Sequence, residues 1–139
     1  AHQFCKPAIE PEFEEIYVDD KLVLVVKIAA SDTKPHYALD ENKKWWVYYR
    51  VNDKSILASK IIVDVIKKSS KANGQLITYT EQEKKLFEHL SLEGRITLKQ
   101  FSKLTRSSYR QAQKILVSLI LSGVIKPHTS DKEEFFTTV

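Results

Sequence analysis

Apolar residues in the second half of the chain recur at intervals of three and four positions, which predicts three consecutive helices. Thr80 and Glu83 form a capping box that opens the first helix, and Gly94 ends it. Thr97 and Gln100 form a second capping box, which opens a shorter helix. The predicted inward positions are Leu86, Phe87 and Leu90 in the first helix, and Leu98, Phe101 and Leu104 in the second.

The third helix of this half follows a turn at Thr105 and Arg106, with Ser107 as its predicted cap, and Gly123 stops it. Its predicted inner stripe is Tyr109, Ala112, Ile115, Leu116, Leu119 and Ile120. Residues 124–126 and 133–139 are predicted to be strands joined by a tip at residues 127–132. Three helices followed by a β-hairpin predict a winged helix-turn-helix domain.

The first half of the chain consists of strand patterns separated by turns, with one helix at its end. Residues 13–18 and 21–29 predict a β-hairpin around a turn at Asp19 and Asp20. The nearly continuous apolar run of the second strand predicts that it is covered on both faces. Residues 45–51 predict a further, aromatic strand, and residues 59–68 predict a helix capped by Ser59.

Together these elements predict an α+β chain with two domains. An incomplete sheet-and-helix domain is expected over residues 1–70, a polar linker over residues 71–79, and the winged helix over residues 80–139. The chain has no methionine, so its first residue is expected to be a processed end or the edge of a fragment. Residues 1–5 have the pattern of a helix whose beginning is absent.

Composition narrows the class of protein. Apolar residues make up 42% and charged residues 29% of the chain, which is typical of a soluble globular protein. No apolar run approaches the ~20 residues that a membrane helix needs, and no secretory leader opens the chain. A single cysteine, Cys5, cannot form an internal disulfide, so we expect a cytoplasmic protein without a membrane anchor.

Charge is distributed unevenly along the chain, whose formal net charge is +4. Residues 96–130 contain no aspartate or glutamate, whereas acidic residues occur on both sides of this stretch. The basic residues within it are Lys99, Lys103, Arg106, Arg110, Lys114 and Lys126. A basic, acid-free surface on a winged helix indicates binding to the phosphates of double-stranded DNA.

The third helix of the predicted winged helix is the candidate recognition helix. Arg110 and Lys114 are expected on its outward face with Gln111 beside them, and arginine and glutamine can bond guanine and adenine. The predicted DNA-binding residues are Lys99, Arg106, Ser107, Ser108, Arg110, Gln111, Lys114, Lys126, His128 and Lys132. Val117 and Leu121 are expected further along the same face, as an exposed pair that contacts a partner chain or the first domain.

A family resemblance rests on short motifs in the first half. They are Lys34-Pro35-His36-Tyr37, an aromatic strand that ends in Tyr49-Arg50-Val51, and the small residues Ser55, Ala58 and Ser59 before a helix. This order resembles the second half of the Alba-like DNA-binding domain of Schlafen-related and helicase-related bacterial proteins. The resemblance covers roughly residues 4–68 and implies DNA binding, often with a winged helix following. The motifs of that family's first half are not in this sequence, so we assign no functional role of that half to this chain.

The sequence leaves an alternative function open, because winged helices also act as protein-interaction and dimerisation modules. Such a module would belong to a larger ATPase-like or nuclease-like protein, and a homodimer suits either function. The aromatic residues of 45–51 can stack on bases, but they are more typical of a sheet's buried face. No catalytic constellation or metal-ligand spacing is present, so neither enzymatic activity nor a cofactor is expected.

Overall fold

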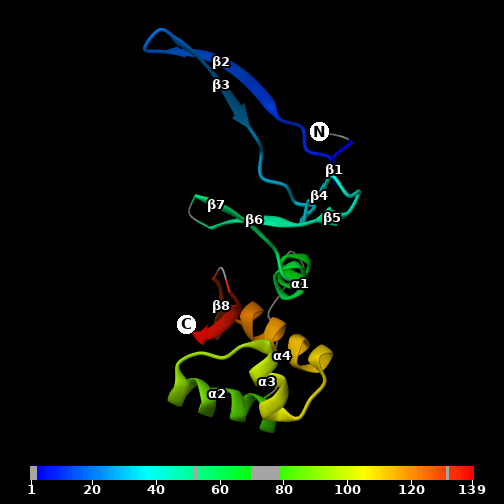
Figure 1. Cartoon of the computed structure of the whole chain (residues 1–139), viewed down its shortest axis with the longest axis vertical. Helices are drawn as coiled ribbons and strands as arrows, with labels where there is room; N and C mark the ends of the chain where they lie inside the picture. The colour runs from blue at the N-terminus through cyan, green and yellow to red at the C-terminus, as the bar shows by residue number, and fades with distance from the viewer. Residues whose placement is uncertain (1–2, 52, 70–78, 131) are drawn as a thin grey trace. The chain divides into compact units, whose positions relative to one another are not determined.

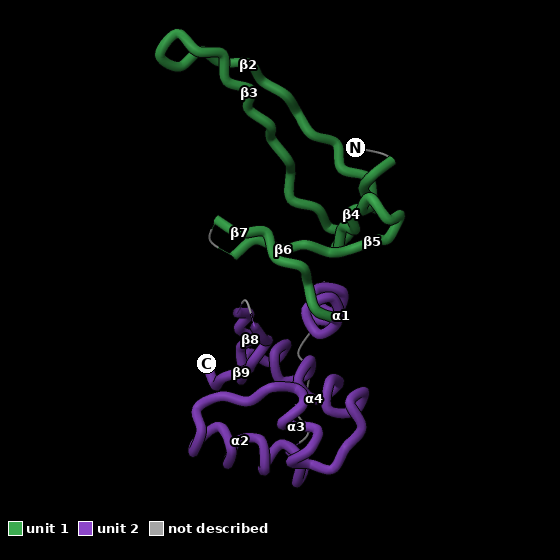
Figure 2. Tube along the Cα trace, in the orientation of Figure 1, with its two compact units in different colours: residues 1–59 green, residues 60–139 purple. Residues whose placement is uncertain are grey.

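The structure is a computed structural model that describes residues 3–51, 53–69, 79–130 and 132–139. The chain divides into two compact units, unit 1 (Ala1–Ser59) and unit 2 (Lys60–Val139), which Figure 2 shows in different colours. Within the described residues, unit 1 contains only strands and unit 2 contains every helix together with one β-hairpin (Figure 1). The fold is therefore α+β, as the sequence predicts.

The strands of unit 1 form three small antiparallel sheets among the described residues. The sheets are β1 (Cys5–Lys6), β4 (Tyr37–Leu39) and β5 (Trp45–Trp46) in the order β1-β4-β5; β2 (Glu12–Val18) with β3 (Lys21–Lys27); and β6 (Tyr48–Val51) with β7 (Lys54–Leu57). Sheets of two or three strands bury little surface, so unit 1 has few fully buried side chains. In the described part of unit 1 only Pro35 and Val47 are buried, and Val47 is 4% exposed.

Several details of unit 1 differ from the sequence predictions. The expected helical end over residues 1–5 is wrong, because Cys5 begins β1 and pairs with Ala38. The single strand predicted over residues 45–51 is broken at Val47, whose carbonyl oxygen accepts a hydrogen bond from the Ala58 N–H at 2.8 Å. Strand β7 was not predicted, since its residues alternate too weakly to give a strand signal.

The β2–β3 hairpin has the predicted turn, but its second strand is not buried on both faces as predicted. Asp19 and Asp20 have positive φ angles of 48° and 60°, as the two central residues of a type I′ turn require. Both strands are exposed over almost their whole length, with Tyr17 76% exposed and Leu24 57% exposed. The prediction of a strand covered on both faces is wrong, because six of the seven residues of β3 are exposed and the seventh is half-buried.

Unit 2 has the element order that the periodicity predicts, preceded by one more helix. Its elements are α1 (Lys60–Ser69), α2 (Glu81–Glu93), α3 (Leu98–Thr105), α4 (Tyr109–Leu121), β8 (Ile125–Thr129) and β9 (Glu134–Thr138). Both predicted capping boxes are present: the Thr80 N–H donates to the Glu83 carboxylate at 2.9 Å, and the Thr97 N–H donates to the Gln100 amide oxygen at 2.8 Å. Gly94 ends α2 with a φ of 73°, a left-handed conformation that favours glycine.

The core of the chain lies in unit 2. Its largest fully buried side chains are Phe101, Phe136, Leu86, Ile96, Leu116, Leu119, Ile125 and Val117. Ile96 and Phe136 exchange two backbone hydrogen bonds, of 3.0 and 2.8 Å, which join the α2–α3 connection to β9. The helices and the β8–β9 hairpin therefore share one apolar core.

Helix α1 packs against α4 within unit 2, although the sequence analysis assigns it to the first domain. Ile61 belongs to the core cluster, and Val65 packs against that cluster. The contact-based division thus falls between Ser59 and Lys60, ahead of the predicted boundary. The predicted linker over residues 71–79 lies outside the described residues except for Tyr79.

Candidate nucleic-acid interface

The turn between α3 and α4 is held by side-chain and backbone hydrogen bonds. The Ser102 hydroxyl donates to the Ser107 carbonyl oxygen at 2.8 Å, and the Thr105 and Ser107 hydroxyl oxygens lie 2.7 Å apart. Arg106 caps α3 in the left-handed conformation, with a φ of 52°. The predicted DNA-binding residue Ser107 is half-buried, and its hydroxyl is hydrogen-bonded to that of Thr105. Its role in this structure is to stabilise the turn.

Helix α4 begins one residue later than predicted. The N-cap is Ser108, not Ser107, and the Ser108 hydroxyl oxygen accepts a hydrogen bond from the Gln111 N–H at 3.2 Å. Tyr109, predicted to lie on the inner stripe, is instead 54% exposed. It is the first residue of the helix, and this end of α4 extends past the core, whose first α4 residue is Ala112. An exposed aromatic side chain therefore stands beside Arg110.

Four of the predicted DNA-binding residues line one open hollow of about 460 Å³ at the start of α4. They are Ser108, Arg110, Gln111 and Lys114. All four are exposed, and no carboxylate lines the hollow. In the described residues, Arg110 and Lys114 have no ion-pair partner, so both charges are available to an incoming anion. The Gln111 amide also donates to the Gln82 amide oxygen of α2 at 3.3 Å, which orients it.

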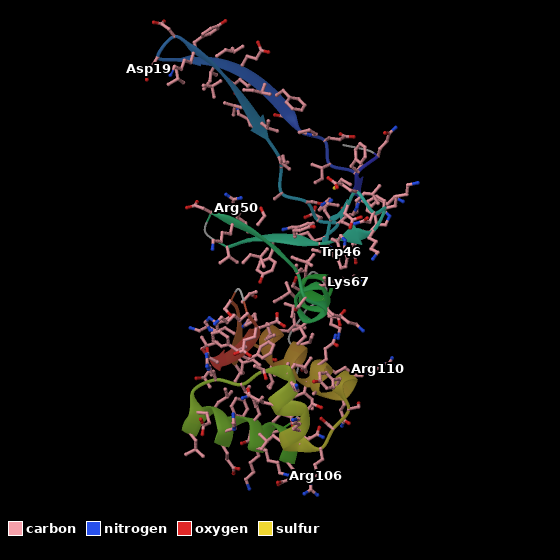
Figure 3. All side chains as sticks on the ribbon, viewed as in Figure 1. Asp19, Trp46, Arg50, Lys67, Arg106 and Arg110 are labelled. Carbon is pink, nitrogen blue, oxygen red and sulfur yellow. The ribbon has the colours of Figure 1, made fainter. Side chains whose placement is uncertain are left out.

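Two other predicted residues of the α3 region are exposed but lie outside this hollow. Figure 3 shows Arg106 well apart from Arg110, although only three residues separate them in the sequence. Lys99 is exposed in the first turn of α3 and also does not line the hollow. The structure therefore concentrates the predicted group at the first turns of α4 and leaves Arg106 and Lys99 as separate charges.

The β8–β9 hairpin carries the remaining predicted residues. Lys126 and Lys132 are exposed. His128 is half-buried: its ring stacks on Phe135 with centroids 5.0 Å apart, and its Nε2 lies 3.0 Å from the Thr137 hydroxyl oxygen. His128 thus helps to hold the hairpin together, and the two lysines are its accessible cations.

Arg95 is a basic residue that the sequence analysis did not select. Its guanidinium lies over the Phe135 ring, 5.5 Å from the ring centre, in a cation–π contact. The sequence feature that could have pointed to it is its position directly before the acid-free stretch of residues 96–130.

The apolar pair predicted at Val117 and Leu121 is not left free for a partner chain. Val117 is only 1% exposed and belongs to the core, and Leu121 is half-buried against that core. Helix α1 packs on α4, and its residue Ile61 belongs to the same cluster as Val117. The pair is therefore not exposed: of the two predicted contacts, a partner chain or the first domain, the structure has the second, because α1 comes from the residues that the sequence assigns to the first domain.

Formal charge separates sharply between the two units. Unit 1 contains eight Lys and Arg against ten Asp and Glu, a net charge of −2. Unit 2 contains fourteen against eight, a net charge of +6. Because α1 belongs to unit 2, the positive charge of the chain is concentrated more strongly than the sequence boundary suggested.

Other kinds of site find no support in the described residues. No group of three or more His, Cys, Asp or Glu is placed to hold a metal ion in that part of the chain. Of the helices that the structure describes, none combines the length and the apolar character that crossing a bilayer requires.

Comparison with known proteins found a family match for one part of the chain. Residues 1–59 match the family model described as Schlafen, AlbA_2. The match covers the whole of unit 1, and it supports both the resemblance seen in the sequence motifs and a DNA-binding role. No curated protein and no solved structure matches the chain. The Schlafen, AlbA_2 match ends where unit 2 begins, so the character of unit 2 rests on its own geometry.

Proposed function

We propose that this chain binds double-stranded DNA through unit 2, which acts as a winged helix whose α4 enters the major groove. The observation that carries this proposal is the gathering of Ser108, Arg110, Gln111 and Lys114 around one open, carboxylate-free hollow. Arginine can bond a guanine edge bidentately, and glutamine can bond an adenine edge. Lysine and the N-terminal end of a helix favour phosphate.

The rest of unit 2 supplies charges suited to the DNA backbone. Lys126 and Lys132 on the hairpin and Lys99 on α3 are exposed, as a wing and a supporting helix would need. One recognition helix reads few base pairs, so we propose that the chain acts as a dimer. The role that fits such a module is regulation of transcription by binding, without catalysis by this chain.

Unit 1 has a different part in this proposal. Its Schlafen, AlbA_2 match supports a DNA-binding protein, but its own net charge is −2 and its β2–β3 hairpin carries three glutamates. Phosphate attraction therefore favours unit 2 as the DNA-contacting surface and leaves unit 1 to assist or to assemble.

The test is duplex-DNA binding as a function of salt, measured by fluorescence anisotropy on the full chain. Replacing Arg110→Ala and Lys114→Ala together is expected to weaken binding by roughly tenfold or more. The slope of log affinity against log salt should become shallower by about 1.8, since each lost phosphate contact removes about 0.9. If one of the two contacts a base, the slope changes by half as much and sequence preference is lost.

A matched control removes two lysines from elsewhere. Lys21→Ala with Lys84→Ala takes one charge from beside the acidic turn of the β2–β3 hairpin and one from an exposed position on α2. This control should keep the wild-type slope. A wild-type chain that binds no duplex in a salt-dependent way would contradict the proposed function outright.

A second candidate function, self-association, is favoured by the β2–β3 hairpin. Residues directly opposite each other on paired strands share a face, so Phe13 and Val26, Glu15 and Leu24, and Tyr17 and Leu22 form one face. Five of these six side chains are large and apolar, and each is at least 48% exposed. Two such faces brought together would bury roughly 1,000 Å², near the lower limit for a specific interface.

Sedimentation velocity tests this candidate. If two copies associate through this face, Tyr17→Lys with Leu24→Lys should shift a dimer to the monomer. Ile16→Lys with Val25→Lys places the same charges on the opposite face and should shift it less. A monomeric wild type at high micromolar concentration would refute the candidate.

A further inference from the structure

Helix α1 lies along one flank of the outward face of α4. Ile61 belongs to the unit 2 core with Val117, and Val65 packs against the same cluster. In Figure 1, α1 and α2 lie on opposite sides of α4, so α1 adds a surface that the three-helix arrangement lacks. The position of α1 matters because α4 carries the candidate interface.

A hydrogen bond fixes which side of α1 faces the basic end of α4. The Gln113 amide of α4 donates to the Asp64 carboxylate of α1 at 2.8 Å. Gln113 comes one turn after Arg110 and directly before Lys114. Asp64 is therefore anchored next to the turns of α4 whose residues line the open hollow.

The stripe of α1 that contains Asp64 also contains two lysines. Lys60, Asp64 and Lys67 are spaced by four and three residues, which puts them on one face of the helix. Both lysine side chains are exposed. Figure 3 shows Lys67 and Arg110 on the same side of unit 2. Because Asp64 lies between them and is bonded to Gln113, the stripe that contains Lys60 and Lys67 is on the side of α1 next to Gln113.

We propose that α1 is a second phosphate-contacting element of the DNA interface, with Lys60 and Lys67 as its contacts and Asp64 as the residue that positions it. The inference rests on the proposed function of unit 2. Seven helical residues span about 10 Å, and lysine stems are long and flexible, so the two ammonium groups can bind separate phosphates beside the groove that α4 enters. Gln113, bonded to Asp64, then serves the scaffold and does not read bases.

The first test removes the two lysines in the full chain. Lys60→Ala with Lys67→Ala should reduce the salt slope of duplex binding by about 1.8, so that the affinity ratio between 50 and 200 mM salt falls by about tenfold. The loss should be the same for different DNA sequences, because phosphate contacts carry no sequence information. The control is the double variant Lys21→Ala with Lys84→Ala, which should keep the wild-type slope.

The results separate this inference from the function on which it rests. If the wild type shows no salt-dependent duplex binding, the proposed function fails and takes the inference with it. If Arg110→Ala with Lys114→Ala weakens binding while Lys60→Ala with Lys67→Ala behaves like the control, only the inference fails. Tighter binding by the latter variant would also overturn it, because α1 would then obstruct DNA.

The second test concerns the positioning role of Asp64. For Asp64→Ala, the loss of charge alone predicts stronger DNA binding, whereas the loss of the positioning bond predicts weaker DNA binding. If Asp64 positions α1, this variant should instead bind several-fold more weakly. Asp64→Asn removes the same charge but keeps an oxygen that accepts the Gln113 hydrogen bond, and it should bind at least as well as the wild type. Equal binding by the two variants, at equal thermal stability, would refute the positioning role.

Discussion

Both units contain segments rich in apolar residues, but only in unit 2 are those segments buried. In unit 2 the periodic positions of α2, α3 and α4 meet around Leu86, Phe101 and Leu116, each of which is fully buried. In unit 1 the apolar run of β3 is as long as any in the chain, yet it remains exposed. An apolar pattern states which face tends to be buried, whereas burial itself requires a second element to pack there.

The difference extends to electrostatics. Unit 2 has a net charge of +6, and Arg110 and Lys114, which have no ion-pair partner in the part of the chain that the structure describes, line an open hollow at the start of α4. Unit 1 has a net charge of −2, and the Glu14 carboxylate of its hairpin pairs with Lys27. The buried core and the positive charge therefore coincide in unit 2, while unit 1 keeps exposed apolar surface.

The chain provides separate optical probes for the two units. Its only tryptophans, Trp45 and Trp46, are both in unit 1. All helices of the described residues are in unit 2, so circular dichroism at the helical wavelengths reports chiefly on that unit. The two signals can be followed on one sample, which allows the comparison to be tested in the intact chain.

The difference between the units should be greatest when the same substitution, leucine to alanine, is made once in each unit and the free energies of unfolding are compared. Leu116→Ala creates a cavity in the unit 2 core and should lower the free energy of unfolding by about 3 kcal/mol. Leu24→Ala, at an exposed site in β3, should change it by no more than about 0.5 kcal/mol. Urea unfolding measures both, followed by circular dichroism for Leu116→Ala and by tryptophan fluorescence for Leu24→Ala. A cost for Leu24→Ala close to that for Leu116→Ala would contradict the difference between the two units.

An intermediate effect is expected at a helix cap. The Thr97 hydroxyl oxygen accepts the Gln100 N–H at 3.2 Å at the start of α3, so Thr97→Ala should destabilise unit 2 by about 1 kcal/mol. The matched change in unit 1, Thr33→Ala, removes only an exposed contact with the Ser31 hydroxyl. Its effect should fall within a few tenths of a kcal/mol. Thermal unfolding at the helical wavelengths measures the effect of Thr97→Ala, and tryptophan fluorescence measures that of Thr33→Ala. A cost for Thr33→Ala as large as that for Thr97→Ala would contradict this expectation.

The smallest effect is a local response of unit 1 to acid. The Lys44 backbone N–H and the Trp46 indole N–H both donate to the Asp40 carboxylate, and they hold its pKa below the usual 3.8. Because the folded pKa is lowered, the stabilisation is present above pH 3.8 and is lost as the pH falls below that value through the folded pKa. Tryptophan fluorescence should change in that range before the helical signal does.

The control for this response is Asp40→Asn, which cannot ionise and should lose this part of the pH dependence of the fluorescence. The helical signal of unit 2 should be the same in both proteins. A fluorescence transition that is identical in wild type and Asp40→Asn would exclude Asp40 as its source.

The candidate interface was predictable where it depended on local sequence. Arg110, Gln111 and Lys114 follow one another at helical spacing after a cap, so their exposure on one face of α4 could be predicted. Tyr109 was misassigned because periodicity does not show how far a helix extends beyond the core that it covers. Arg106 separated from the group because its left-handed backbone turns the chain between two helices.

The local elements could be predicted from the amino-acid sequence: the two capping boxes, the left-handed Gly94, the Asp19-Asp20 turn and the helical stripes of unit 2. These depend on hydrogen bonds and steric limits within a few residues, which a single sequence states directly. Three features became visible only in the folded chain: α1 packs on α4, Val117 is buried, and the β2–β3 hairpin is exposed. Burial depends on contacts between segments far apart in the chain, and an apolar stripe does not specify its partner.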